Sequence, residues 1–305
     1  DFTVWNIRRY GKSMNRKQRL IHNLGTDPVC LPLLLAGASV QQQGVLVELG
    51  TYTGLSSRCL SYGLSTITKD KLGKEAYHAF DVFGHDQNNF EKISRSMPWI
   101  YDVQPDFTVD SSYRWLWHLA VQDIYPDAVG HEGLINATTL YPRMWQKRRI
   151  DVLSVDSAKT WSAFRDQTAG IQRPYMLRKG AILILMDFST IDTQIKLLYS
   201  GCLRDYLQPV YSSFCRGEQW IFVATKTFSL GMVGACMEDY LNNNAEPTDA
   251  QYHDMLEFAK ADVDFMDGLF SKPHDNMKEE RKCLLNKLHN EMHESAAHWK
   301  FLKIQ

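Results

Sequence analysis

Short apolar runs rich in β-branched residues recur along the chain, and stretches with apolar residues at helical spacing separate them. The clearest run is Val45-Leu46-Val47, which predicts a buried strand. Leu55, Cys59 and Leu60 follow at helical spacing. The same pattern predicts further strands over residues 76–81, 150–156 and 181–187, helices over residues 86–93, 111–121 and 161–171, and a β-hairpin over residues 207–225. The alternation predicts an α/β fold.

The first strand runs into a turn that contains two glycines. The strand ends at Glu48, and Gly50 and Gly54 follow before the helix. A strand, a glycine turn and a helix place backbone N–H groups beside a nucleotide-like ligand. The missing side chains let the chain turn sharply and let a ligand approach the backbone. The alternative is an ordinary turn whose glycines only pack.

The spacing of these residues discriminates between ligands. A dinucleotide fold uses G-x-G-x-x-G to hold a pyrophosphate. Here the pattern is E-x-G-x-x-x-G, with Tyr52 in the loop and no middle glycine, which disfavours a nicotinamide-dependent dehydrogenase. This form resembles motif I of class I S-adenosylmethionine-dependent methyltransferases. The resemblance implies a Rossmann-like methyltransferase sheet, mostly parallel with an antiparallel closing hairpin, and a cofactor site that includes Glu48, Gly50, Tyr52, Gly54 and Ser56.

An acidic residue, Asp81, ends the second predicted strand. At the tip of that strand, Rossmann-like folds hydrogen-bond a ribose, because two hydroxyl groups suit a carboxylate. Asp81 is therefore a candidate ribose ligand, and the alternative is a solvent-exposed loop acid. Residues 134–137, followed by Leu140-Tyr141-Pro142, resemble the family segment that contacts adenine, which makes Asn136 a candidate cofactor contact.

The segments around the fourth and fifth strands resemble the catechol O-methyltransferase-like, small-molecule O-methyltransferases. Residues 150–156 end in Asp156 and continue to Lys159 as D-x-x-K, and residues 177–187 end in Asp187. The resemblance implies catalytic roles for Asp156 and for Lys159, the general base, a cofactor contact at Asp156, and a divalent cation such as Mg on Asp156 and Asp187. Phe188 breaks the family's ligand pair, since phenylalanine cannot ligate. The alternative is that both acids accept hydrogen bonds from loop backbone.

Composition narrows the class of protein. The 305 residues are 44% hydrophobic and 23% charged, which is typical of a globular protein with ample core material. The net charge of -1 gives no support for nucleic-acid binding through bulk electrostatics. No apolar run approaches the roughly 18 residues that span a bilayer. Six scattered cysteines without CxxC spacing predict isolated buried thiols.

The predicted organisation is an N-terminal helical brace or lid over residues 1–40, a methyltransferase core over 41–228 and a helical extension over 229–305. The leading hypothesis is a soluble enzyme that methylates oxygen on a small-molecule acceptor. The second is a catalytically inactive methyltransferase-fold subunit of a larger complex, with protein partners at the C-terminal helices. The chain begins at Asp1 rather than methionine, so an upstream segment could have been removed, and the compartment stays open between cytoplasm and an organelle.

Overall fold

The structure is a computed structural model, which describes residues 30–41, 43–67, 75–84, 86–135, 149–169, 177–187, 205–213 and 219–228. The chain divides into two compact units. The first comprises Asp1–Ile135 and Ile150–Ser157, and the second comprises Asn136–Arg149 and Ala158–Gln305. The predicted extension at 229–305, most of the predicted N-terminal brace, Asn136 and Phe188 lie outside the described residues.

The first unit is built on parallel strands. Strand β1 (Val45–Leu49) pairs with β2 (Tyr77–Asp81) on one side and with β4 (Ile150–Val155) on the other. Every residue of these three strands is buried. Parallel strands covered on both faces read as continuous apolar runs, which is why the sequence pattern located them.

Strand β3 (Val129–Glu132) pairs in parallel with β2 and lies at the end of the strand order. The sequence pattern predicted no strand at residues 129–132, and the segment at residues 134–137 that resembles the adenine contact follows β3. The residues of β3, Val-Gly-His-Glu, include a single apolar side chain, and only Gly130 is buried. An edge strand has no second neighbour to require apolar side chains, so hydrophobic periodicity could not reveal it.

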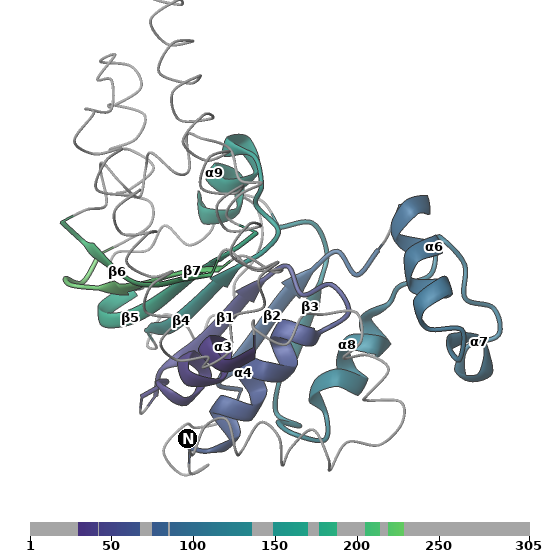
Figure 1. The fold of residues 1–305 in the computed structure, drawn as a ribbon, viewed down its shortest axis with the longest axis horizontal. Helices are drawn as coiled ribbons and strands as arrows, with labels where there is room; N and C mark the ends of the chain where they lie inside the picture. The colour runs from purple at the N-terminus through teal and green to yellow at the C-terminus, as the bar shows by residue number, and fades with distance from the viewer. Residues whose placement is uncertain are drawn as a thin grey trace, which may run out of the picture. The chain divides into compact units, whose positions relative to one another are not determined.

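Two helices of the first unit meet backbone to backbone. Helix α3 (Cys30–Ala38) and helix α4 (Leu55–Ser65) lie side by side in Figure 1. A Cβ atom at Gly37 would overlap the carbonyl oxygen of Leu60, and one at Gly63 would overlap that of Leu34. The two glycines therefore set the distance between the helices.

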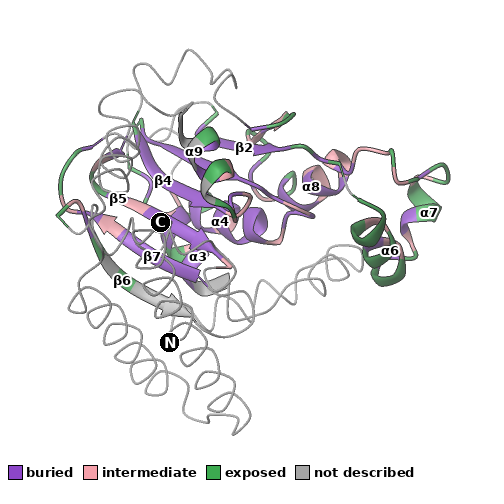
Figure 2. Ribbon diagram, turned by 90° about the horizontal axis from the view of Figure 1, so that it is seen from above, coloured by how far each residue is buried: buried purple, intermediate pink, exposed green. Residues whose placement is uncertain are grey.

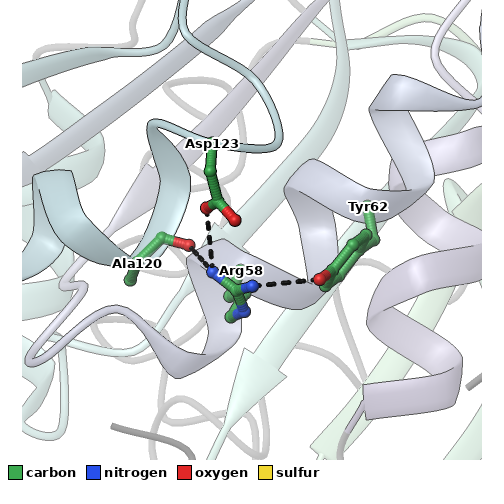
Figure 3. Close-up of polar contacts among 4 residues, drawn as sticks. All are labelled: Arg58, Tyr62, Ala120 and Asp123. Atoms are coloured by element: carbon green, nitrogen blue, oxygen red, sulfur yellow. Dashed lines mark hydrogen bonds and ion pairs between the residues drawn. The ribbon is translucent and has the colours of Figure 1, made fainter. Parts of the chain in front are cut away.

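Helix α4 also contacts α8 (Arg114–Val121) through a buried arginine (Figure 3). Arg58 Nη1 donates to Ala120 O at 2.5 Å and lies 3.2 Å from Asp123 Oδ1, while Nη2 donates to Tyr62 Oη at 2.9 Å. Arg58 is only 1% exposed. Its planar fork thus joins the end of α8 to α4.

Helices α6 (Gln87–Ser96) and α7 (Ile100–Val103) stand away from the strands (Figures 1 and 2). Asp86 caps α6 by accepting a hydrogen bond from Asn89 N at 2.8 Å. Most of α6 is exposed. The helices predicted over residues 86–93 and 111–121 are confirmed as α6 and α8.

The second unit contributes α9 (Trp161–Ala169) and strands β5 (Leu177–Met186), β6 (Leu207–Ser213) and β7 (Gln219–Ala224). Strand β7 runs antiparallel to both β5 and β6. The order of the seven strands is β3-β2-β1-β4-β5-β7-β6. The predicted Rossmann-like α/β sheet with an antiparallel closing hairpin is confirmed.

Two further observations concern a disulfide bond and membrane-spanning helices. Cys59 in α4 is disulfide-bonded, so the prediction of isolated thiols was wrong at this position. Within the described residues, no helix has both the length and the apolar character needed to cross a membrane.

Candidate functional site

The turn after β1 is held in a left-handed backbone conformation. The φ angle is 84° at Gly50 and 91° at Gly54. A Cβ atom at Gly50 would lie 2.7 Å from Ser157 N, and one at Gly54 would lie 2.8 Å from Ala120 Cβ. The protein's own backbone and side chains therefore require both glycines. These contacts favour the packing alternative for the two glycines, whatever else the turn binds.

Tyr52 takes a glycine-like conformation between those two residues. Its φ is 45°, in the region that costs roughly 1–2 kcal/mol for a residue with a Cβ atom. The ring meets Tyr113 edge to face at 6.1 Å, and Lys92 Nζ lies 5.8 Å from its centroid. Burial, followed by the charge of Asp86, raises the pKa of the Tyr52 hydroxyl. Strain of this kind concentrates at functional sites, which directs attention to this turn.

Asp81, at the end of β2, faces the turn as the sequence predicted. Its Oδ2 accepts from Thr51 N at 2.7 Å, from Tyr52 N at 3.1 Å and from Thr51 Oγ1 at 3.3 Å. Its Oδ1 accepts from Phe83 N at 2.8 Å and from Tyr113 Oη at 3.0 Å. The carboxylate thus joins the loops after β1 and β2 to the start of α8.

The protein saturates this carboxylate. Five donors reach Asp81, whereas a carboxylate offers about four lone-pair sites. Asp81 as a whole residue is only 7% exposed to solvent. The amides of Thr51 and Tyr52 point at Asp81 rather than at an open anion site. A hydroxyl of a ligand could bind Asp81 only after one of these donors has moved.

Tyr113 is the residue that most directly covers Asp81. It precedes α8, and its backbone N donates to Phe83 O at 2.8 Å. Its ring also packs edge to face on Phe83 at 5.9 Å. Burial and then the nearby Asp81 charge raise the pKa of Tyr113 well above its ordinary value. The phenol therefore remains a hydrogen-bond donor throughout the physiological pH range.

Glu48 lies beneath the turn rather than on its surface. It is 0% exposed, and its Oε2 accepts from Ser57 Oγ at 2.5 Å and from the Tyr77 hydroxyl. Ser57 Oγ also accepts from Trp117 Nε1 at 2.9 Å. Burial raises the pKa of Glu48 to about 7, hydrogen bonds from serine and tyrosine side chains oppose that rise, and the charge of Asp156 adds to it. In the described structure this carboxyl is out of reach of a ligand, so a direct cofactor contact there stays a prediction.

Asp156 follows β4 and is half-buried. Its backbone N donates to Leu49 O at 2.8 Å, next to the glycine turn. Its charge contributes to the raised pKa values of Glu48 and Tyr113, which places it electrostatically close to both. Ser56, in the first turn of α4, is 7% exposed. The carboxyl ends of β2 and β4 therefore bring negative charge to the glycine turn.

Two exposed apolar residues follow the acidic ends of β2 and β3. Val82 comes directly after Asp81 and is 46% exposed, and Leu134 is 71% exposed. Asp81 and Glu132 are partners in the strand register, and Gly133 N donates to Asp81 O at 2.9 Å. The strand ends at Asp81 and Glu132 are thus each followed, within two residues, by an exposed apolar side chain, and Leu134 lies in the segment where the sequence had indicated Asn136.

Lys159 and Asp187, in the second unit, form an ion pair. Lys159 Nζ lies 3.0 Å from Asp187 Oδ2 and donates to Met186 O at 3.2 Å. Asp187 has a φ of 52° and, like Tyr52 and Phe83, is a non-glycine residue with positive φ shortly after the end of a strand. Among the described residues, no group of three histidine, cysteine or acidic side chains could hold a metal ion. The divalent cation on Asp156 and Asp187 stays a prediction, and we derive no step through a cation.

Sequence reasoning did not single out Tyr113 or Val82, whereas Leu134 lies in the segment 134–137 that it had indicated. Val82 had a local signal, because it is an apolar residue directly after a strand-end acid. Tyr113 lay in the segment predicted as a helix over residues 111–121. Its bond to Asp81 spans 32 residues, and no local pattern reports such a contact.

Comparison with known proteins gives no family. No protein-family model matches the chain, and no curated protein matches it. Among solved structures, an rRNA methylase from Streptococcus thermophilus is similar with a TM-score of 0.36 and 13% identity, over 64% of this chain and 96% of that one. A TDP-rhamnose 3′-O-methyltransferase of calicheamicin biosynthesis gives 0.37 and 14%, over 62% and 75%. TrmK of M. capricolum, in complex with S-adenosylhomocysteine, gives 0.33 and 9%, over 86% and 96%. At these scores the likenesses carry no argument, and the fold assignment rests on the strand order and directions described above.

Proposed function

We propose that the chain binds S-adenosylmethionine and transfers its methyl group to an oxygen atom of a small molecule. The observation that supports this most is the position of Asp81 against the turn after β1, at the carboxyl ends of parallel strands. Ligands of open α/β sheets bind at that end, and a carboxylate there suits the two hydroxyls of a ribose. The proposed ligand is therefore an adenosyl compound.

The charge of the site favours this ligand over a dinucleotide. Asp81 takes the amides of Thr51 and Tyr52, which a pyrophosphate would need. Asp156 adds negative charge close by. A phosphate would be repelled here, whereas S-adenosylmethionine carries a sulfonium and an ammonium group and no phosphate. We further propose that Val82 and Leu134 pack against the adenine, since both offer exposed apolar surface beside the acids.

Methyl transfer needs little more from the protein than alignment of the reacting atoms. Holding the acceptor oxygen, the methyl carbon and the sulfur in line is a proximity effect worth roughly 7–11 kcal/mol. Asp156 and Lys159 remain the proposed catalytic side chains. Lys159 is paired with Asp187, and an ammonium group has no lone pair with which to accept a proton. A role as general base therefore requires that Lys159 leave the ion pair and lose a proton to solvent before it takes the proton of the acceptor hydroxyl.

Calorimetry on the full chain tests the proposal. We expect S-adenosylmethionine and S-adenosylhomocysteine to bind, and NAD to give no heat. Removing either ribose hydroxyl should weaken binding by roughly tenfold or more, because a hydrogen bond to a charged group contributes about 1.5–3 kcal/mol. Absence of binding by both adenosyl ligands at millimolar concentration would contradict the proposal.

One observation favours the second candidate, an inactive methyltransferase-fold subunit. The protein's own groups saturate Asp81, as a site no longer used for ligand binding would allow. This role predicts co-purification in a fixed ratio with partner proteins and no adenosyl binding. The predicted contact region, residues 229–305, lies outside the described residues. Methyl transfer by the isolated chain would exclude this as the only role.

A further inference from the structure

The donors on Asp81 are of two kinds. Three are backbone amides of Thr51, Tyr52 and Phe83, which the loops hold in place. Two are side-chain hydroxyls, and each carboxylate oxygen receives one of them. Tyr113 Oη donates to Oδ1 at 3.0 Å, and Thr51 Oγ1 donates to Oδ2 at 3.3 Å. Phe83 N leaves one lone-pair position on Oδ1, and the Tyr113 hydroxyl fills it. Oδ2 already accepts from two amides, so Thr51 Oγ1 adds a third and longer contact there.

A ribose presents the same pair of groups, two hydroxyls on adjacent carbons. We propose that the hydroxyl of Tyr113 occupies, in the ligand-free chain, the position on Asp81 Oδ1 that one ribose hydroxyl takes on binding, while the longer contact of Thr51 Oγ1 with Oδ2 yields to the other. Tyr113 is then a latch that the nucleoside must displace. This inference rests on the proposed function and concerns the regulation of the same site.

The two hydroxyls differ in how they leave. Thr51 Oγ1 has a second acceptor, Tyr52 O at 3.4 Å, so a change of hydrogen-bond partner releases Asp81. Tyr113 is 3% exposed, and its ring contacts Tyr52 and Phe83 edge to face. To leave Oδ1, the Tyr113 ring must move out from between the two loops. Tyr113 therefore carries most of the cost of opening.

The position of Tyr113 at the start of α8 makes such a movement local. Its backbone N is bonded to Phe83 O, and the preceding Ser111 and Ser112 are half-exposed. A rotation of the side chain breaks the bond to Asp81 without breaking a strand or an interior turn of a helix. The apparent affinity of a ligand that binds only the open state is reduced in proportion to the fraction of molecules that are open.

The decisive variant is Tyr113→Phe, which removes the hydroxyl and keeps the ring. We expect it to bind adenosine about tenfold more tightly than the wild type, because one position on Asp81 is then vacant. We also expect a lower urea midpoint, because the ligand-free fold loses a hydrogen bond to a charged group. Tyr101→Phe is the matched control. The Tyr101 hydroxyl, on α7, donates a hydrogen bond to Ser94 Oγ of α6 at 3.0 Å, at the exposed surface. That variant should match the wild type in affinity.

A ligand series identifies the mechanism. Adenosine, 2′-deoxyadenosine and 3′-deoxyadenosine are titrated into both the wild type and Tyr113→Phe. The latch predicts that the gain in affinity disappears for the deoxy ligand that lacks the hydroxyl bound by Oδ1. An equal gain for all three ligands would overturn the latch, because the variant would then act by making room. A loss of affinity, or no change, would overturn it as well.

The outcomes separate the latch from the proposed function. If the wild type and Tyr113→Phe bind S-adenosylhomocysteine with equal affinity, the proposed function stands and the latch is wrong. If neither binds any adenosyl ligand at millimolar concentration, the proposed function fails and the latch fails with it. Binding by Tyr113→Phe alone would support the latch and contradict the proposed function of the wild type.

Discussion

Glu48 is a fully buried acid in the first unit. It is 0% exposed, and burial raises its pKa from 4.5 to about 7. In the unfolded chain it ionises near pH 4.5, so between about pH 4.5 and 7 unfolding releases a proton. The free energy of unfolding must therefore fall as the pH rises through that window, by about 3 kcal/mol in all. Above the window both states are ionised and the dependence ends.

Replacement of Glu48 by glutamine tests this assignment. We expect Glu48→Gln to remove that fall, since glutamine does not titrate and still offers an oxygen to Ser57 and Tyr77. Urea denaturation at a series of pH values measures the slope. Glu91→Gln on exposed α6 is the control and should keep the wild-type slope. An unchanged slope in Glu48→Gln would place the titration elsewhere.

The positions of single site residues could be predicted from the sequence only in part. It placed Asp81 beside the glycine turn, because two strand ends in a parallel sheet meet at one edge. It did not reveal that Tyr113 covers that acid, or that Glu48 faces inward. Both depend on which side chains occupy the space around a carboxylate, and that is decided by residues far away in the chain.

At the scale of elements, the contact between α3 and α4 depends on two glycines. Gly63→Ala would place a methyl group on the Leu34 carbonyl oxygen. We expect a loss of about 1–3 kcal/mol in the free energy of unfolding from overpacking, larger than the gain in helix propensity of about 1 kcal/mol. Gly84→Ala is the control, because its nearest neighbour, Val82 O, would be 3.9 Å away. Equal urea midpoints for the two variants would contradict the packing shown.

The junction of α4 with α8 depends on Arg58. Arg58→Met keeps the apolar stem but leaves Ala120 O without its donor, so we expect a loss of about 2–3 kcal/mol. Asp123→Asn removes only the charge of a side chain that is 47% exposed and should cost less than about 1 kcal/mol. Thermal unfolding of both variants measures the difference. A larger effect at Asp123 would reverse the assignment.

The elements themselves were largely predictable. Strands β1, β2 and β4 are buried on both faces, so their letters are continuous apolar runs. Strand β3 has one strand neighbour and polar letters, and its place could only be read from its pairing with β2. Helix α7, a single turn, is too short to show periodicity.

At the scale of the whole molecule, the Cys59 disulfide is the covalent constraint that sequence spacing did not suggest. Loss of a disulfide typically lowers the free energy of unfolding by about 2–4 kcal/mol. We expect dithiothreitol to lower the melting temperature of the wild type, and Cys59→Ser to melt lower and to be insensitive to reductant. A wild type that is insensitive to reductant would contradict the bond.

Tyr52 has a consequence for how such chains are found. A tyrosine keeps the left-handed bend at the position where the dinucleotide pattern has its second glycine. The loop thus has the left-handed shape although the second glycine of the motif is absent. Sequence motifs overlook such chains. Comparison of backbone torsion angles at the ends of consecutive strands would identify distant proteins with this fold.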